Sequence, residues 1–375
     1  MLISSDSLSI YVHIPFCVRK CLYCDFLSFN CGRRDIDEYF AALLTEIKDT
    51  SSEYSRFHVK SIFFGGGTPS YVDAEHICDT LKCIRDNYDV ADDAEISIEC
   101  NPASAIYDKL VAYRKAGFNR ISIGAQSLID EELLRIGRAH NVAMFYETFD
   151  NARKAGFENI NVDIMSALPG QSMESYMETL AKVVDLCPEH ISAYSLIIEE
   201  GTPFYDMDLD LPDEDEDRRM YHETKRFLSE HGYHRYEISN YAKDNCECYH
   251  NKVYWKRGNY LGVGLGASSM VDDVRWKNTE ELNEYISHIN PHNELQSLTK
   301  SECMEDFMFL GLRLTSGVSL TDFKTEFGQD IDAVYGKIID KYVADGLLMR
   351  SGDNLFLSDE GMDVSNTVMA DFLLD

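Results

Sequence analysis

The sequence contains no continuous apolar run approaching the 18 residues that a membrane-spanning helix needs. Its first ten residues, MLISSDSLSI, lack the basic segment and apolar stretch of a secretory leader. Without such a leader, the eleven cysteines predict reduced thiols rather than disulfides. We therefore expect a cytoplasmic protein whose thiols are available as metal ligands.

Basic charge is also scarce in this chain. It has 35 Lys and Arg residues against 65 Asp and Glu residues, which gives a formal net charge of −30 at pH 7. Nucleic-acid binding depends on basic side chains that neutralise phosphates, and adhesion to anionic lipid depends on the same charges. The balance predicts that neither nucleic acid nor an anionic membrane surface is a partner.

Short, apolar, β-branched runs alternate with helical patterns over the first half of the chain. These runs predict six strands, at residues 8–14, 61–64, 95–99, 120–124, 159–165 and 190–197. Strands joined by helical crossovers pair in parallel, with right-handed connections. The predicted fold class is therefore α/β, a partial (β/α)6 barrel whose chemistry lies at the C-terminal ends of its strands.

The pattern changes near residue 300, where three helical segments are followed by two short strand-like runs. We therefore expect a barrel unit with its extension at residues 1–290 and a small helical, winged-helix-like domain at residues 300–375. The second unit has six Lys or Arg residues against fifteen Asp or Glu residues. That charge predicts a packing or partner-docking module rather than a DNA-binding one.

Three cysteines, Cys17, Cys21 and Cys24, fall within eight residues. Thiolates are soft ligands that suit zinc or an iron–sulfur cluster. A structural zinc site takes four protein ligands, and the next cysteine, Cys31, is loosely spaced for that role. Three ligands leave one iron of a [4Fe–4S] cluster open, which is the interpretation we favour. The alternative is a chance group of reduced thiols.

The residues before and within this group resemble a known family. Tyr11-Val-His-Ile-Pro-Phe-Cys17, followed by CxxxCxxC, is similar to the opening of the radical S-adenosylmethionine (SAM) superfamily. The resemblance covers about residues 8–320 and is closest to the branch of oxygen-independent coproporphyrinogen oxidases and heme chaperones. It implies that SAM chelates the open iron, and that an electron from a donor cleaves SAM to a deoxyadenosyl radical.

The same resemblance implies a SAM site at the strand ends. Glycines after the second strand let a ligand approach bare backbone. Carboxylate or amide groups at strand ends can bond ribose hydroxyls, and an arginine can pair with the carboxylate of SAM. Each residue alone could equally be a solvated loop residue. The expected set is Tyr11, Tyr23, Gly66, Gly67, Thr68, Glu99, Gln126, Arg138, Asp163 and Ile197.

A second motif, His250-Asn251-x-x-Tyr254-Trp255, resembles a signature of the heme chaperones in this branch. An imidazole can ligate heme iron while adjacent aromatic rings cover the porphyrin, and Cys248 is a second possible axial ligand. The alternative is that these aromatics only cap a barrel end. The family often has Gly-Ala-His-Ser where this chain has residues 266–269, Gly-Ala-Ser-Ser, so any role of that histidine is absent.

Two features separate the enzymes of the branch from the carriers. Coproporphyrinogen oxidases usually have a longer N-terminal extension, whereas sixteen residues precede Cys17 here. They also tend to have a fourth cysteine where this chain has Phe26. We therefore expect a heme chaperone that delivers heme to apo-hemoproteins, respiratory ones included. The alternatives are radical decarboxylation of coproporphyrinogen III and another radical SAM reaction.

Overall fold

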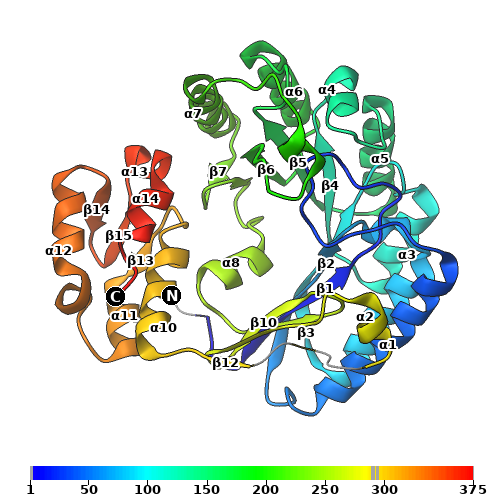
Figure 1. Cartoon of the computed structure of the whole chain (residues 1–375), viewed down its shortest axis with the longest axis horizontal. Coiled ribbons are helices and arrows are strands. Elements are labelled where there is room, and N and C mark those ends of the chain that lie inside the picture. Colours follow the sequence, from blue (N-terminus) through cyan, green and yellow to red (C-terminus); the bar gives the residue numbers. More distant parts are fainter. Residues whose placement is uncertain (1–2, 289–291, 293–294, 375) are drawn as a thin grey trace.

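The computed structural model describes residues 3–288, 292 and 295–374. These residues form a large hydrophobic core in an open barrel and a second core built mainly from residues 298–374, and a small third cluster, which includes Leu133, Leu168 and Phe204, lies beside the barrel. Figure 1 shows the C-terminal helices as a separate group beside the barrel, with one short helix, α8, between the two. No helix in the described ranges is long and apolar enough to cross a membrane.

Six parallel strands make the barrel wall and follow one another in chain order. They are β1 (Ser7–Ile14), β2 (His58–Gly66), β3 (Asp89–Cys100), β4 (Arg120–Gln126), β5 (Asn159–Ser166) and β6 (His190–Ser195). The predicted partial (β/α)6 barrel is confirmed. Ile197 lies outside β6, because the strand ends two residues earlier than the apolar run indicates.

Helices cover the outer face of this wall (Figure 1). They are α1 (Arg33–Ser51), α2 (Ala74–Asn87), α3 (Tyr107–Ala116), α4 (Asp130–Arg135), α5 (Val142–Ala155) and α6 (Met173–Asp185). Side chains alternate along each strand. The apolar set, such as Val12, Ile62 and Ile121, is fully buried in the large core. Polar residues of the other set therefore face the barrel interior.

The sheet continues beyond the six predicted strands on both sides. On one side, β9 pairs in parallel with β1, and β10, β11 and β12 then pair one after another in antiparallel fashion. On the other side, β8 pairs antiparallel with β6, and β7 pairs antiparallel with β8. Their bounds are β7 (His234–Arg235), β8 (Asn240–Ala242), β9 (Tyr260–Val263), β10 (Ser268–Val271), β11 (Val274–Lys277) and β12 (Gln296–Ser297). Strands of two to four residues give too little alternation to be recognised from sequence.

The remaining elements connect the barrel to the C-terminal group. Short 3-10 helices η1 (Pro69–Tyr71) and η2 (Pro203–Asp206) lie in loops, and α7 (Glu214–Glu230), α8 (Tyr249–Trp255) and α9 (Leu282–Ile286) precede the second core. That core contains α10 (Lys300–Gly311), α11 (Leu320–Phe327), α12 (Ile331–Ala344), α13 (Asp359–Asp363), α14 (Ser365–Ala370), β13 (Val318–Ser319), β14 (Leu348–Ser351) and β15 (Asn354–Leu357). Helices followed by the β14–β15 hairpin confirm the winged-helix-like pattern.

Candidate functional site

The barrel interior opens into a cavity of about 480 Å³. Three parts of the chain line it: the loop between β1 and α1, the inward-facing side chains of the strands, and α8 with one residue that follows α10. Parallel strands bring their C-terminal ends to one edge of a sheet, so residues distant in sequence meet there. The site residues predicted at the strand ends should therefore lie close together in this cavity.

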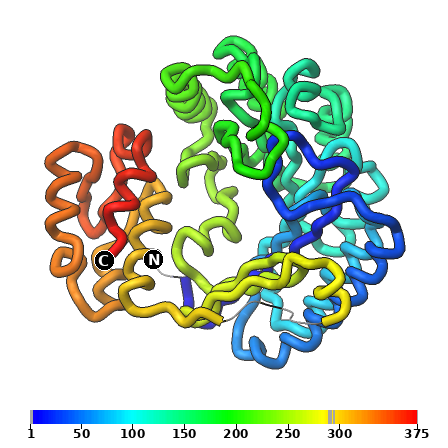
Figure 2. Tube along the Cα trace, viewed as in Figure 1, coloured from blue at the N-terminus to red at the C-terminus, as the bar shows by residue number. Residues whose placement is uncertain are grey.

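The cysteine loop is fixed over the strand ends by backbone hydrogen bonds. The amide of Leu22 donates to the carbonyl of Ile136, 3.2 Å away, and the amide of Phe204 donates to the carbonyl of Leu22 at 3.0 Å. Figure 2 shows this dark-blue segment beside the green residues that follow β6. Cys17, Cys21 and Cys24 all line the cavity as a result.

All three thiols are free. The Sγ of Cys17 lies 3.2 Å from the Oγ1 of Thr68. Burial raises the pKa of the Cys17 thiol. Burial raises the pKa of Cys24 to about 11. No three His, Cys, Asp or Glu side chains in the described residues are grouped so that they could hold a single metal ion. Ligands of a cubic cluster each bind a different iron, so three separated thiols fit a cluster better than one ion.

The glycine turn after β2 packs directly against β1. Gly66 has φ +107°, and a Cβ there would lie 2.5 Å from the ring of His13. A Cβ on Gly67 would lie 2.8 Å from the carbonyl oxygen of Ile14. The Gly66 amide donates to Oε2 of Glu99 at 3.2 Å. The turn therefore needs glycine for its own packing, and it places bare backbone beside a buried carboxyl.

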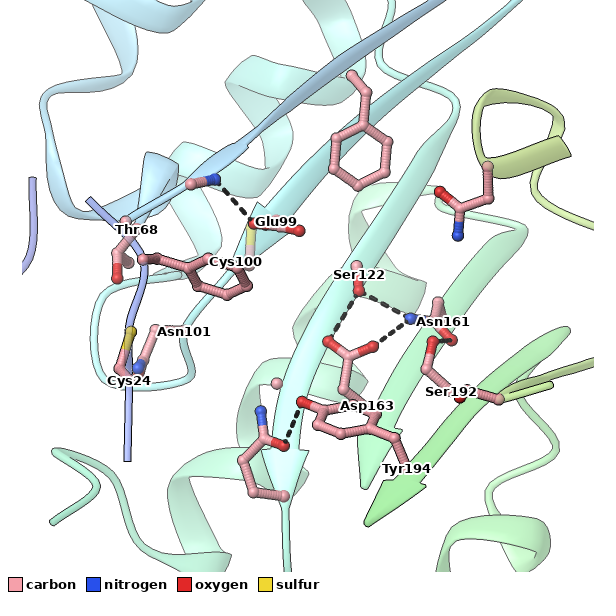
Figure 3. Close-up of a pocket in the computed structure, with 18 of the residues that line it drawn as sticks. Cys24, Thr68, Glu99, Cys100, Asn101, Ser122, Asn161, Asp163, Ser192 and Tyr194 are labelled. Carbon is pink, nitrogen blue, oxygen red and sulfur yellow. Dashed lines mark hydrogen bonds between the residues drawn. The ribbon is translucent and has the colours of Figure 1, made fainter. Parts of the chain in front are cut away.

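Glu99 of β3 and Asp163 of β5 place two acidic groups on the strand wall of the cavity, with Ser122 of β4 between them (Figure 3). Burial, with a smaller effect of the Asp163 charge, raises the pKa of Glu99 to about 8. Asp163 accepts hydrogen bonds from the Ser122 hydroxyl at 3.0 Å and from Nδ2 of Asn161 at 2.6 Å. Burial still raises its pKa. Both carboxyls are thus half-buried and oriented, and they are open to a ligand with hydroxyl groups.

Gln126 and Arg138 complete this polar wall. Gln126 has φ +66°, an uncommon conformation for a residue other than glycine. Its Oε1 accepts a hydrogen bond from Tyr194 at 3.1 Å. The Nη2 of Arg138 donates to the carbonyl of Gly124 at 2.7 Å, while Nη1 lies 3.8 Å from the Sγ of Cys21. The guanidinium is therefore held between β4 and the cysteine loop.

Helix α8 closes the opposite side of the cavity and is anchored by Glu95 of β3. The carboxylate accepts hydrogen bonds from the amides of Tyr249 at 2.9 Å and His250 at 3.1 Å, where it complements the helix N-terminus. The Sγ of Cys248 donates to Glu95 at 3.4 Å, and Cys248 is 0% exposed. Cys248 therefore points away from the cavity and does not line it.

His250 is fully engaged inside the protein. Its Nδ1 lies 2.8 Å from the Ser61 hydroxyl, and its Nε2 lies 2.9 Å from the hydroxyl of Tyr254. Burial and the nearby Arg120 charge lower the pKa of His250 to about 3, so the ring is neutral. A neutral imidazole is the form that binds metals, but both nitrogens here already have hydroxyl partners.

The cavity brings together nearly all predicted site residues. Ile197 is 67% exposed and, like Cys248, does not line the cavity. The sequence prediction missed other lining residues, namely Phe63, Asn101, Arg120, Ser122, Asn161, Ser192, Tyr194, Glu237, Asn240 and Arg313. Asn161 lies two residues before the predicted Asp163 on β5, and the missed residues of β4 and β6 form pairs two residues apart, Arg120 with Ser122 and Ser192 with Tyr194. Alternation along the strands could therefore have found them.

Family models match both parts of the chain. The radical SAM superfamily model matches residues 11–183, and the HemN C-terminal domain model matches residues 298–364. With the parallel partial barrel and its three-cysteine loop, these matches define a radical SAM protein with a HemN-type C-terminal domain. Membership of this superfamily implies a [4Fe–4S] cluster and SAM as cofactors.

Full-length relatives narrow the family further. The heme chaperone HemW of Bacillus subtilis (strain 168) is 35% identical over 374 residues, which cover 97% of this chain and 99% of that protein. HemW of Lactococcus lactis subsp. lactis (strain IL1403) is 34% identical over 373 residues, which cover 98% of this chain and 97% of that protein. The structure of coproporphyrinogen III oxidase (HemN) from Escherichia coli superposes with TM-score 0.86 and 26% identity, over 98% of this chain and 90% of that one. The chain belongs to the HemW family.

Proposed function

We propose that the protein is a heme chaperone that binds a [4Fe–4S] cluster, SAM and heme and delivers heme to apo-hemoproteins. The observation that carries this proposal is the identity of 34–35% with two heme chaperones named HemW over 97–98% of this chain. The cavity supports it, because polar and aromatic side chains line the same space.

The cluster ligands in this proposal are Cys17, Cys21 and Cys24. Their thiols are free and line one cavity, and no fourth cysteine lines it beside them except Cys100, which belongs to β3. When bound, such a cluster supplies the electron that cleaves the sulfonium of SAM. Binding of iron requires loss of the thiol protons, so the buried Cys17 and the half-buried Cys24 would release protons on loading.

SAM would bind against the polar wall. The exposed backbone of Gly66 and Gly67 can meet its amino group, and Arg138 beside the cysteine loop is placed to meet a carboxylate. Glu99 and Asp163 offer oxygens for ribose hydroxyls. Tyr11, Tyr23, Thr68 and Gln126 line the same region and would contact the rest of the molecule.

Heme would lie against the aromatic wall, which is formed by Tyr11, Phe63, His250, Tyr254 and Trp255. The rings of Phe63 and His250 are stacked with centroids 5.1 Å apart. Apolar porphyrin faces gain most of their binding free energy from such surfaces. His250 can ligate the iron only when its Nε2 gives up the hydroxyl of Tyr254.

This function requires partners besides heme. We infer an electron donor for the cluster and apo-hemoprotein acceptors, respiratory proteins among them, in a reducing cytoplasm. The strongly acidic chain, with a net charge of −30, favours acceptors that present basic or neutral surfaces.

Heme titration of the anaerobically reconstituted protein tests the proposal. We expect a saturable Soret band with about one heme per chain, in the presence of a loaded cluster. A Trp255→Leu variant should lower heme occupancy and leave the iron content unchanged. Lys337→Leu, on the C-terminal domain, is a control that should alter neither quantity. The absence of saturable binding by the reconstituted protein would contradict the proposal.

One alternative function is favoured by a specific observation. The TM-score of 0.86 with coproporphyrinogen III oxidase means that the same barrel and C-terminal domain can also support an enzyme. Product analysis separates the two functions, because the oxidase removes carboxyl groups from its substrate while a chaperone returns heme unchanged.

A further inference from the structure

Two arginine side chains on the cavity wall lack a described hydrogen-bond acceptor. Arg120 at the start of β4 is 2% exposed, and its Nε has no hydrogen-bond partner. The buried Nε of Arg313, two residues after α10, is also unpaired. Neither guanidinium forms a hydrogen bond or an ion pair within residues 3–288, 292 and 295–374. Buried polar groups are nearly always paired, so two such groups in one cavity indicate a missing ligand.

Other buried arginines of the chain behave differently. Arg235 and Arg257 also have an unpaired Nε, but their terminal nitrogens donate to Tyr221 at 2.7 Å and to Asp273 at 2.7 Å. Arg138 likewise uses its terminal nitrogens, as described above. Only in Arg120 and Arg313, among these five side chains, is the whole guanidinium left without a described hydrogen-bond acceptor.

The two arginines lie at opposite ends of α8. The charge of Arg120 lies near Cys248, the residue that precedes the helix, and near Glu95. At the other end, the guanidinium carbon of Arg313 is 4.4 Å from the centre of the Trp255 ring. A helix rises about 1.5 Å per residue, so the ends of the seven-residue α8 are about 10 Å apart. One extended ligand can therefore reach both.

Carboxyl groups near these arginines are already occupied elsewhere. Glu95 accepts from the first amides of α8, and Asp163 accepts from Ser122 and Asn161. Beside Arg313, Glu237 accepts from the amide of Ser239 at 3.0 Å. These acids offset part of each positive charge without supplying hydrogen bonds to it. The N–H donors of both guanidiniums remain available to an anionic ligand.

We propose that Arg120 and Arg313 bind the carboxylate side chains of the ligand that lies along α8, one at each end. The proposal rests on the function proposed above, because heme is an apolar ring with two carboxylate side chains. A guanidinium binds a carboxylate through two parallel hydrogen bonds. In a chain of net charge −30, such local positive groups are needed to hold a dianion.

Comparison of heme with its dimethyl ester tests this assignment without altering the fold. The ester keeps the ring and the iron but cannot form ionic bonds through its side chains. We expect the reconstituted wild-type protein to bind heme at least about tenfold more tightly than the ester, since a hydrogen bond to a charged group contributes about 1.5–3 kcal/mol. Equal affinities would overturn the assignment and leave the heme function standing.

Variants assign the effect to residues. Arg313→Gln should lose most of the preference for heme over the ester while its affinity for the ester stays unchanged. Arg350→Gln is the matched control, because Arg350 is paired with Asp332 on the C-terminal domain, outside the cavity. Arg120→Gln should remove a further part of the preference for heme over the ester. If this variant fails to fold, the wild-type comparison and Arg313→Gln still test the assignment. Failure of both ligands to bind would contradict the heme function itself.

Discussion

The cysteine loop and helix α8 both carry family motifs, but their reactive atoms stand in opposite situations. The cluster-motif thiols have long sulfur contacts, such as 3.2 Å from Cys17 to Thr68 and 3.8 Å from Cys21 to Arg138. The imidazole of His250 instead has a hydroxyl within 2.9 Å of each nitrogen. The loop is thus prepared for a ligand, whereas α8 is already complete as a structural element.

This difference indicates two modes of binding. A cluster held by three thiols displaces only weak sulfur hydrogen bonds, such as those to Thr68 and Arg138, so it can be a permanent part of the protein. Iron ligation by His250 must displace Tyr254, which lowers the net gain from the iron–nitrogen bond. We infer that heme is held mainly by ring contacts and is released readily, as a carrier requires.

The largest expected effect is the loss of the cluster. Replacing Cys17, Cys21 or Cys24 by Ala should abolish the iron–sulfur absorbance after reconstitution, because each of the three cysteines binds a different iron of the cluster. Iron and sulfide analysis measures the result. Cys187→Ala is the control, since Cys187 is exposed and lies outside the cavity. Retention of four irons by all three variants would refute the assignment.

Substitutions in α8 and in the cysteine loop should differ in their cost to the free energy of unfolding. His250→Ala removes a buried ring, takes the described partner of the Tyr254 hydroxyl and leaves Ser61 with Ser9 alone, so it should lower the free energy of unfolding by roughly 2–4 kcal/mol. Cys24→Ala should cost less than about 1 kcal/mol in the cluster-free protein. Chemical denaturation of both variants gives the values. Equal losses would remove the distinction between α8 and the loop.

Heme absorption spectra should show whether His250 ligates the iron and whether Tyr254 competes with the iron for its Nε2. His250→Ala should shift or weaken the Soret band while the cluster remains, whereas Tyr254→Phe should free Nε2 of His250 and strengthen the iron–imidazole spectrum. Titration of both variants at matched cluster content provides the comparison. A wild-type spectrum in His250→Ala would exclude this residue as the iron ligand.

A smaller effect concerns pH and Glu99. Its pKa is about 8 in the folded protein against an ordinary value of 4.5, so the folded state keeps a proton that the unfolded state releases. The contribution of this group to stability is therefore present at low pH and is lost as pH rises from about 4.5 to about 8. Glu99→Gln should gain roughly 1–3 kcal/mol relative to wild type between pH 5 and pH 8. A difference that does not change with pH would contradict the buried, protonated carboxyl.

The smallest effect is expected for SAM affinity. Asp163→Ala should weaken SAM binding about tenfold, which corresponds to one or two lost hydrogen bonds, and should leave the iron content unchanged. Equilibrium dialysis with the reconstituted protein measures the affinity. Glu131→Ala, an exposed residue of α4, serves as the control. Unchanged affinity in Asp163→Ala would count against SAM at the strand ends.

Sequence alone predicted the barrel well, because its signals are local and strong. The helical pattern that follows the glycine turn, at about residues 74–87, coincides with α2. The six buried strands of the barrel lie where the apolar runs predict them. The strands β7, β8 and β10 to β12 were not predicted, since two to four residues cannot show a period of two. Their places depend on pairing with distant parts of the sheet.

The candidate site was predictable where a residue follows a strand and was missed where packing decides. Glu99 and Gln126 lie at strand ends and line the cavity as expected. Arg120 lies at the start of its strand, and it lines the cavity because it belongs to the same inward-facing set of β4 as Ser122 and Gly124. Arg313 comes from the C-terminal domain, and its place over Trp255 follows from tertiary packing that no local pattern encodes.

The most direct test of the central claim is a single anaerobic incubation of the reconstituted protein with reductant and SAM. One half receives coproporphyrinogen III, and the other receives heme followed by an apo-hemoprotein. The account predicts transfer of unchanged heme to the acceptor and no protoporphyrinogen in the first half. Protoporphyrinogen formed with stoichiometric deoxyadenosine, and no transfer of heme, would contradict it.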